Sequence, residues 1–399
     1  MRGRIVAVVA LVACLAFAAT SLSADRATTR STGSTSDLAA KPVVPLRVQR
    51  LLKERAPRAA YAPTRLQKST PNRVVSLAMD GPRIAYDVAR GYPVGRCNGV
   101  YVWNVASGAT AHMSGASSCG NEGSSSGEGV REVAVAGPRV AWIVNEGGNT
   151  YHKDYLYTAA LPRPKEHLLA SAYREGEGEE GLTCGQPHPR SSGKWVGCLV
   201  GAQTALVVNR WSTGRSGDVT SARLESIGNR LRKITADRGS MDAVSTDGKR
   251  VAVVRRDGTV ALYSTGGRSL LRVVSSSAAE AALRGEDLVV LTRTGTLEVR
   301  NSHSGRLLHS WQLAAGARFV DVCRGLASYA APLHGGYEAH AVHIIGLSSG
   351  KDKIVARHPY VWTTVGDVQL EPAGLAYDVG VGRASDRGAV VFLPMSSLR

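Results

Sequence analysis

The sequence predicts an all-β protein in which a motif of short strands and tight turns repeats along most of the chain. Glycine makes up 44 of the 399 residues, or about 11%, above the usual ~7%, which favours a fold rich in turns. Runs of four to six residues with many β-branched side chains are bounded by Gly, Asp or Ser, as is typical of strands. Residues 75–399 contain no long segment with the 3.6-residue period of an amphipathic helix.

The first 24 residues have the three parts of a secretory signal peptide. Arg2 and Arg4 form a basic region, residues 5–19 are apolar, and small residues follow; the apolar run is short for a membrane span. A lipoprotein signal is the alternative, because residues 11–14 end in Cys14 and fit the lipid-attachment pattern, although apolar residues continue beyond it. We therefore expect a secreted or envelope-associated protein with no transmembrane span after removal of the signal.

The net charge of +17 is concentrated after this signal. Residues 25–75 contain 11 Lys or Arg and 3 Asp or Glu, which gives +8. We predict that residues 25–72, rich in Ser, Thr, Ala and Pro, form a basic linker. It would either attach the protein to an anionic surface or act as a solvated spacer. Nucleic acid is not expected as a partner, because aromatic and basic residues do not alternate as they do in nucleic-acid-binding proteins.

A turn followed by a short apolar strand recurs along residues 73–399. The clearest copies begin at Gly81, Gly137, Gly193 and Gly248, and weaker copies begin near residues 285, 324 and 373. Their spacing is near 56 residues at first and about 37 in the middle, the range of one four-stranded unit with a variable connection. A strand that ends in a Ser-Gly or Gly-Gly turn follows, most clearly in residues 102–108, 262–266, 299–305 and 344–350.

Residues 241–274 illustrate one complete unit. Strands are predicted at 243–245, 251–255, 259–264 and 269–274. The turns Asp247-Gly248 and Asp257-Gly258 separate the first three strands; Asp-Gly is a strong hairpin signal, because both residues tolerate positive φ. Four such strands cannot bury both faces alone, whereas a ring of about seven units can, and it leaves only short, protected edges.

We therefore predict a single β-propeller of about seven four-stranded blades over residues 73–399. The last blade, from Asp367, has room for three clear strands before the C-terminus. A closed ring needs a fourth strand, and we expect the N-terminal side to donate it, either from residues 43–48 or from residues just before Arg73.

This pattern resembles the WD40-like and TolB-like β-propeller repeat family over residues 73–399. The strand ends with Ser-Gly turns carry the resemblance, and Trp103-Asn104 stands where a WD40 repeat has its Trp-Asp pair. No blade has a Trp-Asp pair or a Gly-His pair at the expected place. The resemblance implies the fold and leaves the activity open, because propellers host binding, scaffolding and several enzyme chemistries.

Five cysteines remain once Cys14 leaves with the signal: Cys97, Cys119, Cys184, Cys198 and Cys323. Exported proteins can keep disulfides. Proximity along the chain favours the structural pairs Cys97–Cys119 and Cys184–Cys198, although spacing alone does not fix connectivity. Cys323 ends an apolar run and is expected to be a buried free thiol in a strand, since a reactive thiol would need a basic neighbourhood.

No catalytic residue, cofactor or metal ligand is predicted. Residues 123–127 match the G-x-S-x-G nucleophile motif, but they lie in a Gly/Ser-rich stretch without the strand-turn-helix that the motif requires. His340 and His343 lie three apart in a predicted strand and therefore on opposite faces, which is poor for one metal. The acidic stretch 175–180 lacks the ordered pattern of a calcium loop.

Two further sets of residues allow two interpretations each. Asp80, Asp247, Asp257 and Asp321 lie near predicted turns, where Asp stabilises the turn backbone; the alternative is a ring of carboxylates at the channel mouth. The tryptophans Trp103, Trp142, Trp195, Trp211, Trp311 and Trp362 fall mostly one per blade. We expect them to pack between blades, with a sugar-binding platform as the alternative.

The function expected from these observations is an exported, non-catalytic, monomeric propeller that binds a protein or a cell-envelope polymer. Insertions at 91–99, 114–129 and 176–193 concentrate in the first three blades, and loops held by disulfides suit recognition. The alternative is an envelope enzyme, of lyase or glycosidase type, with carboxylates converging in the central channel. A purely structural protein held at the wall by its basic linker is the third hypothesis.

Overall fold

The computed structural model describes residues 65–70, 74–88, 99–113, 127–147, 152–174, 180–181, 199–213, 219–237, 241–273, 275, 277–333, 339–358, 363–381 and 387–398. All of them belong to the compact unit Ala62–Arg399. The predicted signal peptide, most of the basic linker and the four cysteines of the predicted disulfides lie outside the described residues.

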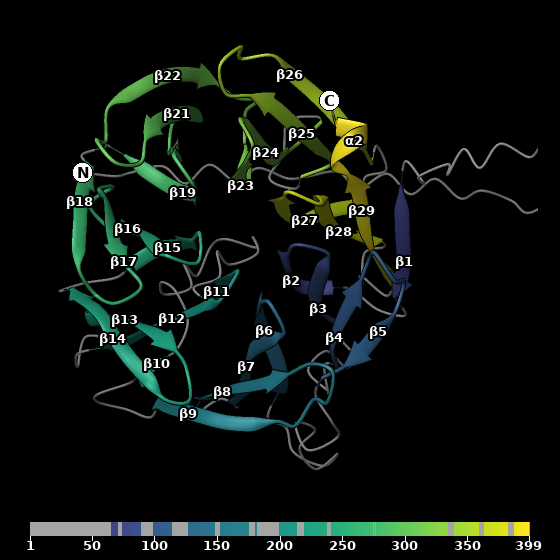
Figure 1. Ribbon diagram of the computed structural model, residues 1–399, viewed down its shortest axis with the longest axis vertical. Coiled ribbons are helices and arrows are strands. Elements are labelled where there is room, and N and C mark those ends of the chain that lie inside the picture. Colours follow the sequence, from purple (N-terminus) through teal and green to yellow (C-terminus); the bar gives the residue numbers. More distant parts are fainter. Residues whose placement is uncertain are drawn as a thin grey trace, which may run out of the picture. The chain divides into compact units, whose positions relative to one another are not determined.

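Seven antiparallel sheets follow one another along the chain and form a ring (Figure 1). Blade 1 comprises β2 (Val74–Asp80), β3 (Arg83–Val88), β4 (Gly99–Asn104) and β5 (Thr110–His112). Blade 2 comprises β6 (Gly127–Ala136), β7 (Arg139–Gly147), β8 (His152–Ala160) and β9 (His167–Arg174). Blade 3 comprises β10 (Glu180–Gly181), β11 (Leu199–Ala202), β12 (Ala205–Thr213), β13 (Val219–Ile227) and β14 (Leu231–Asp237). We call the strand that lines the channel in each blade its inner strand, namely β2, β6, β11, β15, β19, β23 and β27, and the outermost its rim strand.

The second half of the ring has the same organisation. Blade 4 comprises β15 (Met241–Thr246), β16 (Arg250–Arg255), β17 (Val260–Ser264) and β18 (Ser269–Val273). Blade 5 comprises β19 (Ala278–Arg284), β20 (Asp287–Thr292), β21 (Thr296–Asn301) and β22 (Leu307–Gln312). Blade 6 comprises β23 (Arg318–Cys323), β24 (Leu326–Ala331), β25 (Ala341–Gly346) and β26 (Asp352–Arg357). Blade 7 comprises β27 (Thr363–Glu371), β28 (Gly374–Val381), β29 (Arg387–Pro394) and β1 (Leu66–Thr70), and α2 (Met395–Leu398) follows β29. No helix among the described residues is long and apolar enough to cross a membrane.

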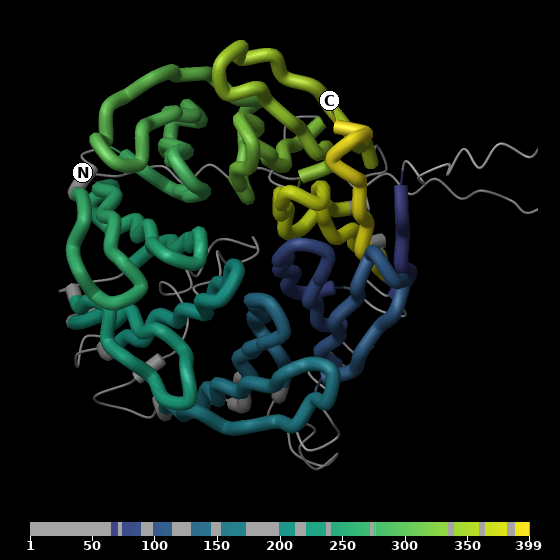
Figure 2. Tube along the Cα trace, in the orientation of Figure 1, coloured from purple at the N-terminus to yellow at the C-terminus, as the bar shows by residue number. Residues whose placement is uncertain are grey.

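The last blade is completed by a strand from the N-terminal side. β1 pairs antiparallel with β29, with Leu66 opposite Phe392 and Thr70 opposite Gly388. Of the two candidate segments, the one just before Arg73 supplies the strand, and β1 therefore precedes the predicted start of the propeller at 73. Figure 2 shows the purple and yellow ends of the propeller side by side. Backbone pairing between β1 and β29 thus closes the ring.

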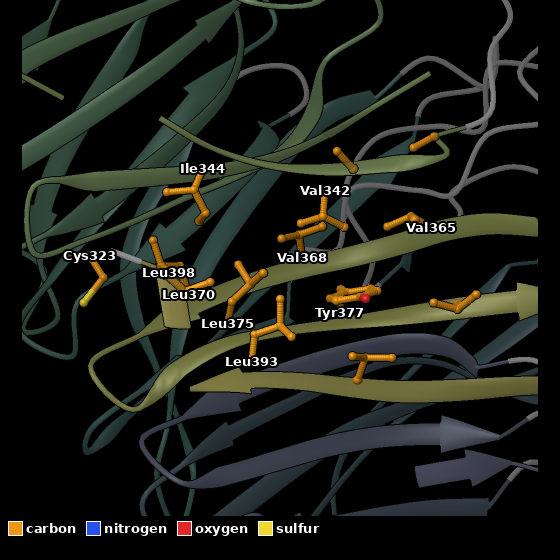
Figure 3. Packing of buried hydrophobic residues seen from close by; sticks show 14 of the residues in the cluster. Cys323, Val342, Ile344, Val365, Val368, Leu370, Leu375, Tyr377, Leu393 and Leu398 are labelled. Atoms are coloured by element: carbon orange, nitrogen blue, oxygen red, sulfur yellow. The ribbon is translucent and has the colours of Figure 1, made fainter. Parts of the chain in front are cut away.

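The apolar runs of the strands in the middle of the blades are explained by burial on both faces of the sheet. In β16 the whole stretch Val251–Val254 is buried, because neighbouring blades cover both faces of the sheet. The rim strand β22, by contrast, has no buried residue. Side chains of adjacent blades meet in shared clusters, such as the one between blades 6 and 7 in Figure 3, where Val342 and Ile344 pack with Leu370 and Leu375. Cys323 is a buried free thiol at the end of β23, as predicted.

The predicted unit 241–274 is confirmed by β15 to β18, but the third blade differs from its prediction. Its inner hairpin turns at Gln203-Thr204, whereas the motif at Gly193 lies outside the described residues. Gln203 has φ 52, close to the φ 57 of Gly81 and Gly137 in the same turn of blades 1 and 2. The sequence motif, which begins with glycine, does not predict this turn. The backbone amide of Gln203 donates a hydrogen bond to the Asp80 carboxylate, which stabilises the left-handed conformation of Gln203.

The two faces of the ring have different connections. Turns between first and second strands and between third and fourth strands lie on one face, which we call the short-turn face; each spans two to six residues, from 81–82 to 161–166. The strand ends that border most internal gaps in the description, such as 89–98 and 114–126, lie at the opposite face, which we call the long-connection face. The gap 182–198 instead interrupts the inner edge of blade 3, because Gly181 pairs with Trp211 and Leu199 pairs with Val208, both within β12.

Candidate functional site in the central channel

The inner strands of all seven blades line a central cavity of about 440 Å³, a volume suited to a small molecule. Its lining mixes small side chains with charged ones. The charged residues are Arg131, Glu132, Glu280, Arg284, Asp321, Asp367 and Glu371. These carboxylates are the residues that an enzyme acting from the channel would use, so their partners decide what the channel can do.

Side chains of the inner strands accept hydrogen bonds from the inner strand of the next blade. Three of these bonds join blades 7, 1, 2 and 3: Leu77 N to Asp367 Oδ2 (2.9 Å), Val133 N to Ser76 Oγ (3.3 Å) and Leu199 N to Glu132 Oε2 (2.9 Å). Three more join blades 4 to 5, 5 to 6 and 6 to 7: Leu283 N to Ser245 Oγ (3.2 Å), Val320 N to Glu280 Oε2 (2.8 Å) and Leu370 N to Asp321 Oδ2 (2.7 Å). We call these six contacts the inter-blade hydrogen bonds.

β-Bulges in the inner strands place the acceptors. The register of β2 shifts between Val74 and Leu77, next to the acceptor Ser76, and that of β27 shifts between Val365 and Val368, next to Asp367. A bulge leaves a backbone amide unpaired and redirects a side chain. The amide of Ser76 is satisfied by the buried Asp87 carboxylate at 2.7 Å.

A second set of contacts lies at the short-turn end of the channel. The Asp80 carboxylate accepts hydrogen bonds from Gly137 N (2.6 Å) and Gln203 N (2.9 Å), and it therefore joins the inner turns of blades 1, 2 and 3. Arg284 of blade 5 forms an ion pair with Glu371 of blade 7. Both side chains are largely buried, so the charges on each depend on the other.

Burial shifts the ionisation of these groups. It raises the pKa of Glu371 to about 8; Arg284 opposes this shift, and Asp321 and Asp80 add to it. Burial also raises the pKa values of Glu280 and Asp321 above the usual range. Burial lowers the pKa of Arg284, but the neighbouring Glu371 and Asp321 outweigh this and raise it. A buried carboxyl that keeps its proton near pH 7 is the state a general acid needs.

The carboxylates nevertheless act first as structural acceptors. Glu132, Glu280 and Asp367 each use an oxygen on a backbone amide of the next blade. Asp321 accepts from Val322 N (2.8 Å) as well as from Leu370 N. No group of three or more His, Cys, Asp or Glu side chains within the described ranges is arranged to hold a metal ion.

The four aspartates singled out in the sequence divide into two pairs. Asp247 accepts from the amides of Lys249 (3.0 Å) and Arg250 (2.8 Å), and Asp257 accepts from the amide of Thr259 (2.9 Å), as predicted for turn residues. Asp80 and Asp321 join different blades, which neither interpretation anticipated. One sequence pattern could have predicted the acceptors between blades. The turn after the inner strand begins five positions after the acceptor in four blades, with the acceptors Ser76, Glu132, Glu280 and Asp367.

Other predicted residues have structural surroundings or lie outside the described part of the chain. Trp103, Trp142 and Trp211 are buried in clusters shared with a neighbouring blade, and Trp311 Nε1 of blade 5 donates to Leu347 O of blade 6 at 3.0 Å, so these four pack between blades as expected. Trp195, Trp362, residues 123–126 and 175–179, and Cys97, Cys119, Cys184 and Cys198 are not described, and the two disulfide pairs stay predictions.

His340 and His343, the two histidines considered as a metal pair in the sequence, have different neighbours. His343 Nδ1 lies 3.0 Å from Asp352 Oδ2, and Tyr329 donates to the same oxygen at 2.6 Å. His340 lies before β25, and its carbonyl accepts from the amide of His358 at 2.8 Å. Burial, Arg65 and His340 lower the pKa of His358. These contacts place the two histidines in separate parts of blade 6.

Comparison with known proteins identifies the fold. No family model matches the sequence, and no curated protein matches it. The WD40 β-propeller domain of Doa1 is similar in structure, with a TM-score of 0.50 and 13% identity over 84% of this chain and 98% of that domain. A chain of the mitotic checkpoint complex is also similar, with a TM-score of 0.50 and 16% identity over 82% of this chain and 90% of that chain. At these identities the likeness concerns the fold alone: the protein is a seven-bladed β-propeller with WD40-like architecture.

Proposed function

We propose that the chain is an exported, non-catalytic binding or scaffold module for a protein or a cell-envelope polymer. The observation that carries this proposal is the use of the channel carboxylates: Glu132, Glu280, Asp321 and Asp367 accept backbone hydrogen bonds between blades. Carboxylates committed in this way stabilise the ring, and they are poorly suited to move protons or to attack a substrate.

On this proposal, the partner or polymer binds at the long-connection face. The strand ends at that face lead into the segments 89–98 and 114–126, which contain Cys97 and Cys119 of one predicted disulfide. Binding residues concentrate on connections held by a rigid scaffold, and the inter-blade hydrogen bonds make the scaffold rigid. The similar propeller chain from the mitotic checkpoint complex comes from a protein assembly, which fits a binding function.

The proposal is tested with glycan and peptide arrays probed by the full chain and by two variants. Glu132→Gln alters a channel carboxylate, and the deletion of residues 120–125 shortens the segment between β5 and β6, whose bordering strand ends lie at the long-connection face. We expect specific binding that survives in Glu132→Gln and is lost in the deletion variant. Binding that depends on Glu132, or the absence of binding to any probe on both arrays, would contradict the proposal.

Export is tested separately. Residues 1–24, fused to a reporter enzyme that is active only outside the cytoplasm, are expected to give activity. Replacement of Arg2 and Arg4 by Glu should reduce it, because the basic region orients the signal. An inactive reporter would contradict export and leave the binding proposal to be judged on the arrays.

The envelope enzyme is the second candidate, and one observation favours it: burial raises the pKa of Glu371 to about 8 beside a cavity of about 440 Å³. A lyase or glycosidase assay on wall polysaccharides tests this candidate. Activity lost in Glu371→Gln and retained in the turn variant Asp257→Asn would support an enzyme. Cooperative thermal melting shows that the unaltered chain and both variants are folded. If none of these folded proteins has activity, the binding module is supported.

A further inference from the structure

The turns of the short-turn face carry many exposed basic side chains. Eight Lys or Arg residues lie in these turns, and all eight are exposed: Arg163, Lys165, Arg230, Lys249, Arg268, Arg306, Arg324 and Lys351. They come from five consecutive blades, 2 to 6. Because inner strands run in the same direction around a propeller, these side chains share one face of the molecule.

Acidic residues do little to neutralise this face. The same turns contain three carboxylates: Glu166, Asp247 and Glu286. Asp247 is buried and forms an ion pair with Arg250 at 2.7 Å, so it is not available to the eight exposed cations. Within the described part of the chain none of the eight forms an ion pair. The turns of this face therefore carry a net positive charge.

Exposed leucines border the same face. Four large apolar side chains are notably exposed among the described residues: Leu168 (47%), Leu270 (44%), Leu307 (46%) and Leu308 (39%). Each is the first or second residue of a rim strand, directly after a basic turn. Arg268 precedes Leu270, and Arg306 precedes Leu307 and Leu308. The leucines thus alternate with cations around the rim of one face.

The basic N-terminal segment reaches the propeller at this face as well. β1 runs antiparallel to β29 and begins opposite the end of β29, where α2 follows. Residues 25–64, which precede β1, contain 8 Lys or Arg and 3 Asp or Glu, a net charge of +5. β1 begins at the short-turn face and is thus the first described strand after a chain segment with a net positive charge.

We propose that the short-turn face docks on an anionic phospholipid bilayer, as a second surface distinct from the recognition face. Its cations would lie at the headgroups, and Leu168, Leu270, Leu307 and Leu308 would enter the interfacial region. Lys and Arg near an anionic membrane surface each favour binding, and apolar side chains beside them anchor a peripheral protein. A soluble polyanion would use the cations alone and would leave the leucines in water. Docking in this way directs the long-connection face away from the membrane.

The charge test compares two variants of the full chain with the same change in net charge. Lys249→Glu with Arg268→Glu alters the short-turn face. The control, Arg256→Glu with Arg357→Glu, alters exposed side chains at the long-connection face. On vesicles of 70% phosphatidylcholine and 30% phosphatidylglycerol we expect binding weakened at least about tenfold for the first variant and by less than about twofold for the control. Equal loss in both variants, or no binding to these vesicles by the unaltered chain, would overturn the proposal.

The leucine test separates a bilayer from a soluble polyanion. Leu307→Gln with Leu308→Gln retains every charge, and thermal melting checks that the variant folds. We expect weaker binding to the same vesicles and unchanged binding to inorganic polyphosphate. If the variant binds both as the unaltered chain does, and polyphosphate competes with the vesicles, the face is a polyanion site and docking on a bilayer is refuted.

Discussion

The two faces of this propeller differ in the connections between their strands. On the short-turn face, turns of two to six residues connect strands in register, and Asp80 joins three of these turns. On the long-connection face the strands lead into segments that vary from blade to blade in length and composition. The difference teaches that stability and recognition are separated in this molecule: one face maintains the ring, and the other is free to vary.

The largest expected effect comes from opening the ring at its closure. Deletion of residues 65–70 removes β1 and its pairing with β29. At roughly 0.5–1.5 kcal/mol per lost hydrogen bond, together with the loss of Leu66, we expect a decrease of about 4 kcal/mol in the free energy of unfolding. Deletion of residues 120–125, of equal length and within the segment between β5 and β6, whose bordering strand ends lie at the long-connection face, should cost less than about 1 kcal/mol. Urea unfolding of both variants measures the contrast, and equal losses would remove the distinction between the faces.

Arg284 provides the next largest effect. In Arg284→Met, Glu371 stays buried without its cation, and removing one partner of a buried ion pair costs about 3 kcal/mol. The loss should be greatest at pH 9, where Glu371 is ionised, and smaller at pH 5, where the carboxyl is protonated because burial raises its pKa. Unfolding measured at both pH values checks this. A loss that is larger at pH 5 would show that the pair is not held as described.

Each inter-blade hydrogen bond should contribute less to the free energy of unfolding than the Arg284–Glu371 ion pair. Asp367→Ala leaves the Leu77 amide without its acceptor, which costs about 2 kcal/mol. Asp367→Asn keeps an acceptor oxygen and should recover about half of that loss. Asp257→Ala, in a turn of the long-connection face, removes an acceptor within one blade and should cost about 1 kcal/mol or less. Denaturant titrations of the three variants would contradict the account if Asp257→Ala were the most destabilised.

Glu371 also gives the unaltered protein a pH dependence. Its folded-state pKa of about 8 lies above the ordinary glutamate value of 4.5, so the folded state binds more protons than the unfolded state between these pH values. Stability from this group is therefore complete below pH 4.5 and is lost as the pH rises through 8, with a slope on the order of 1 kcal/mol per pH unit at most. Glu371→Gln should flatten the stability profile between pH 5 and 8. An unchanged slope would assign the dependence to other groups.

The smallest effect concerns the turn of blade 3. Gln203 has φ 52 where blades 1 and 2 have glycine. Gln203→Gly should remove the strain of the left-handed conformation and stabilise the protein by a few tenths of a kcal/mol, because the greater backbone entropy of glycine in the unfolded state offsets part of the gain. The midpoint of thermal unfolding measures the change, and a clear destabilisation would show that the Gln203 side chain has a role that the turn geometry does not reveal.

The sequence predicted the parts of the fold that local chemistry determines. The Asp-Gly turns and β-branched runs of residues 241–274 correspond to β15–β18, because each strand is bounded by residues with a strong conformational preference. The fourth strand of blade 7 was also foreseen, since a ring cannot end on an open edge. The turn at Gln203 was missed, because a distant carboxylate stabilises it.

The channel contacts were harder to predict, because they join residues far apart in the chain. Arg284 and Glu371 come from blades that are not neighbours, and nothing in either local sequence indicates the other. Glu132, Glu280 and Asp367 occupy the same position relative to their turns. Their use as acceptors became apparent only once the bulges and the neighbouring amides were placed.

Hydrogen exchange at single amides tests the central claim, that channel carboxylates hold the blades together. The amides of Leu77, Leu199, Val320 and Leu370 lie in the inner strands around the channel, and the account predicts slow exchange for all four, because each donates to a carboxylate of the preceding blade. In Asp321→Ala, which removes the acceptor, exchange at Leu370 should accelerate while that at Leu199 stays slow. Rapid exchange at these four amides in the unaltered protein, while the core strands remain protected, would contradict the claim.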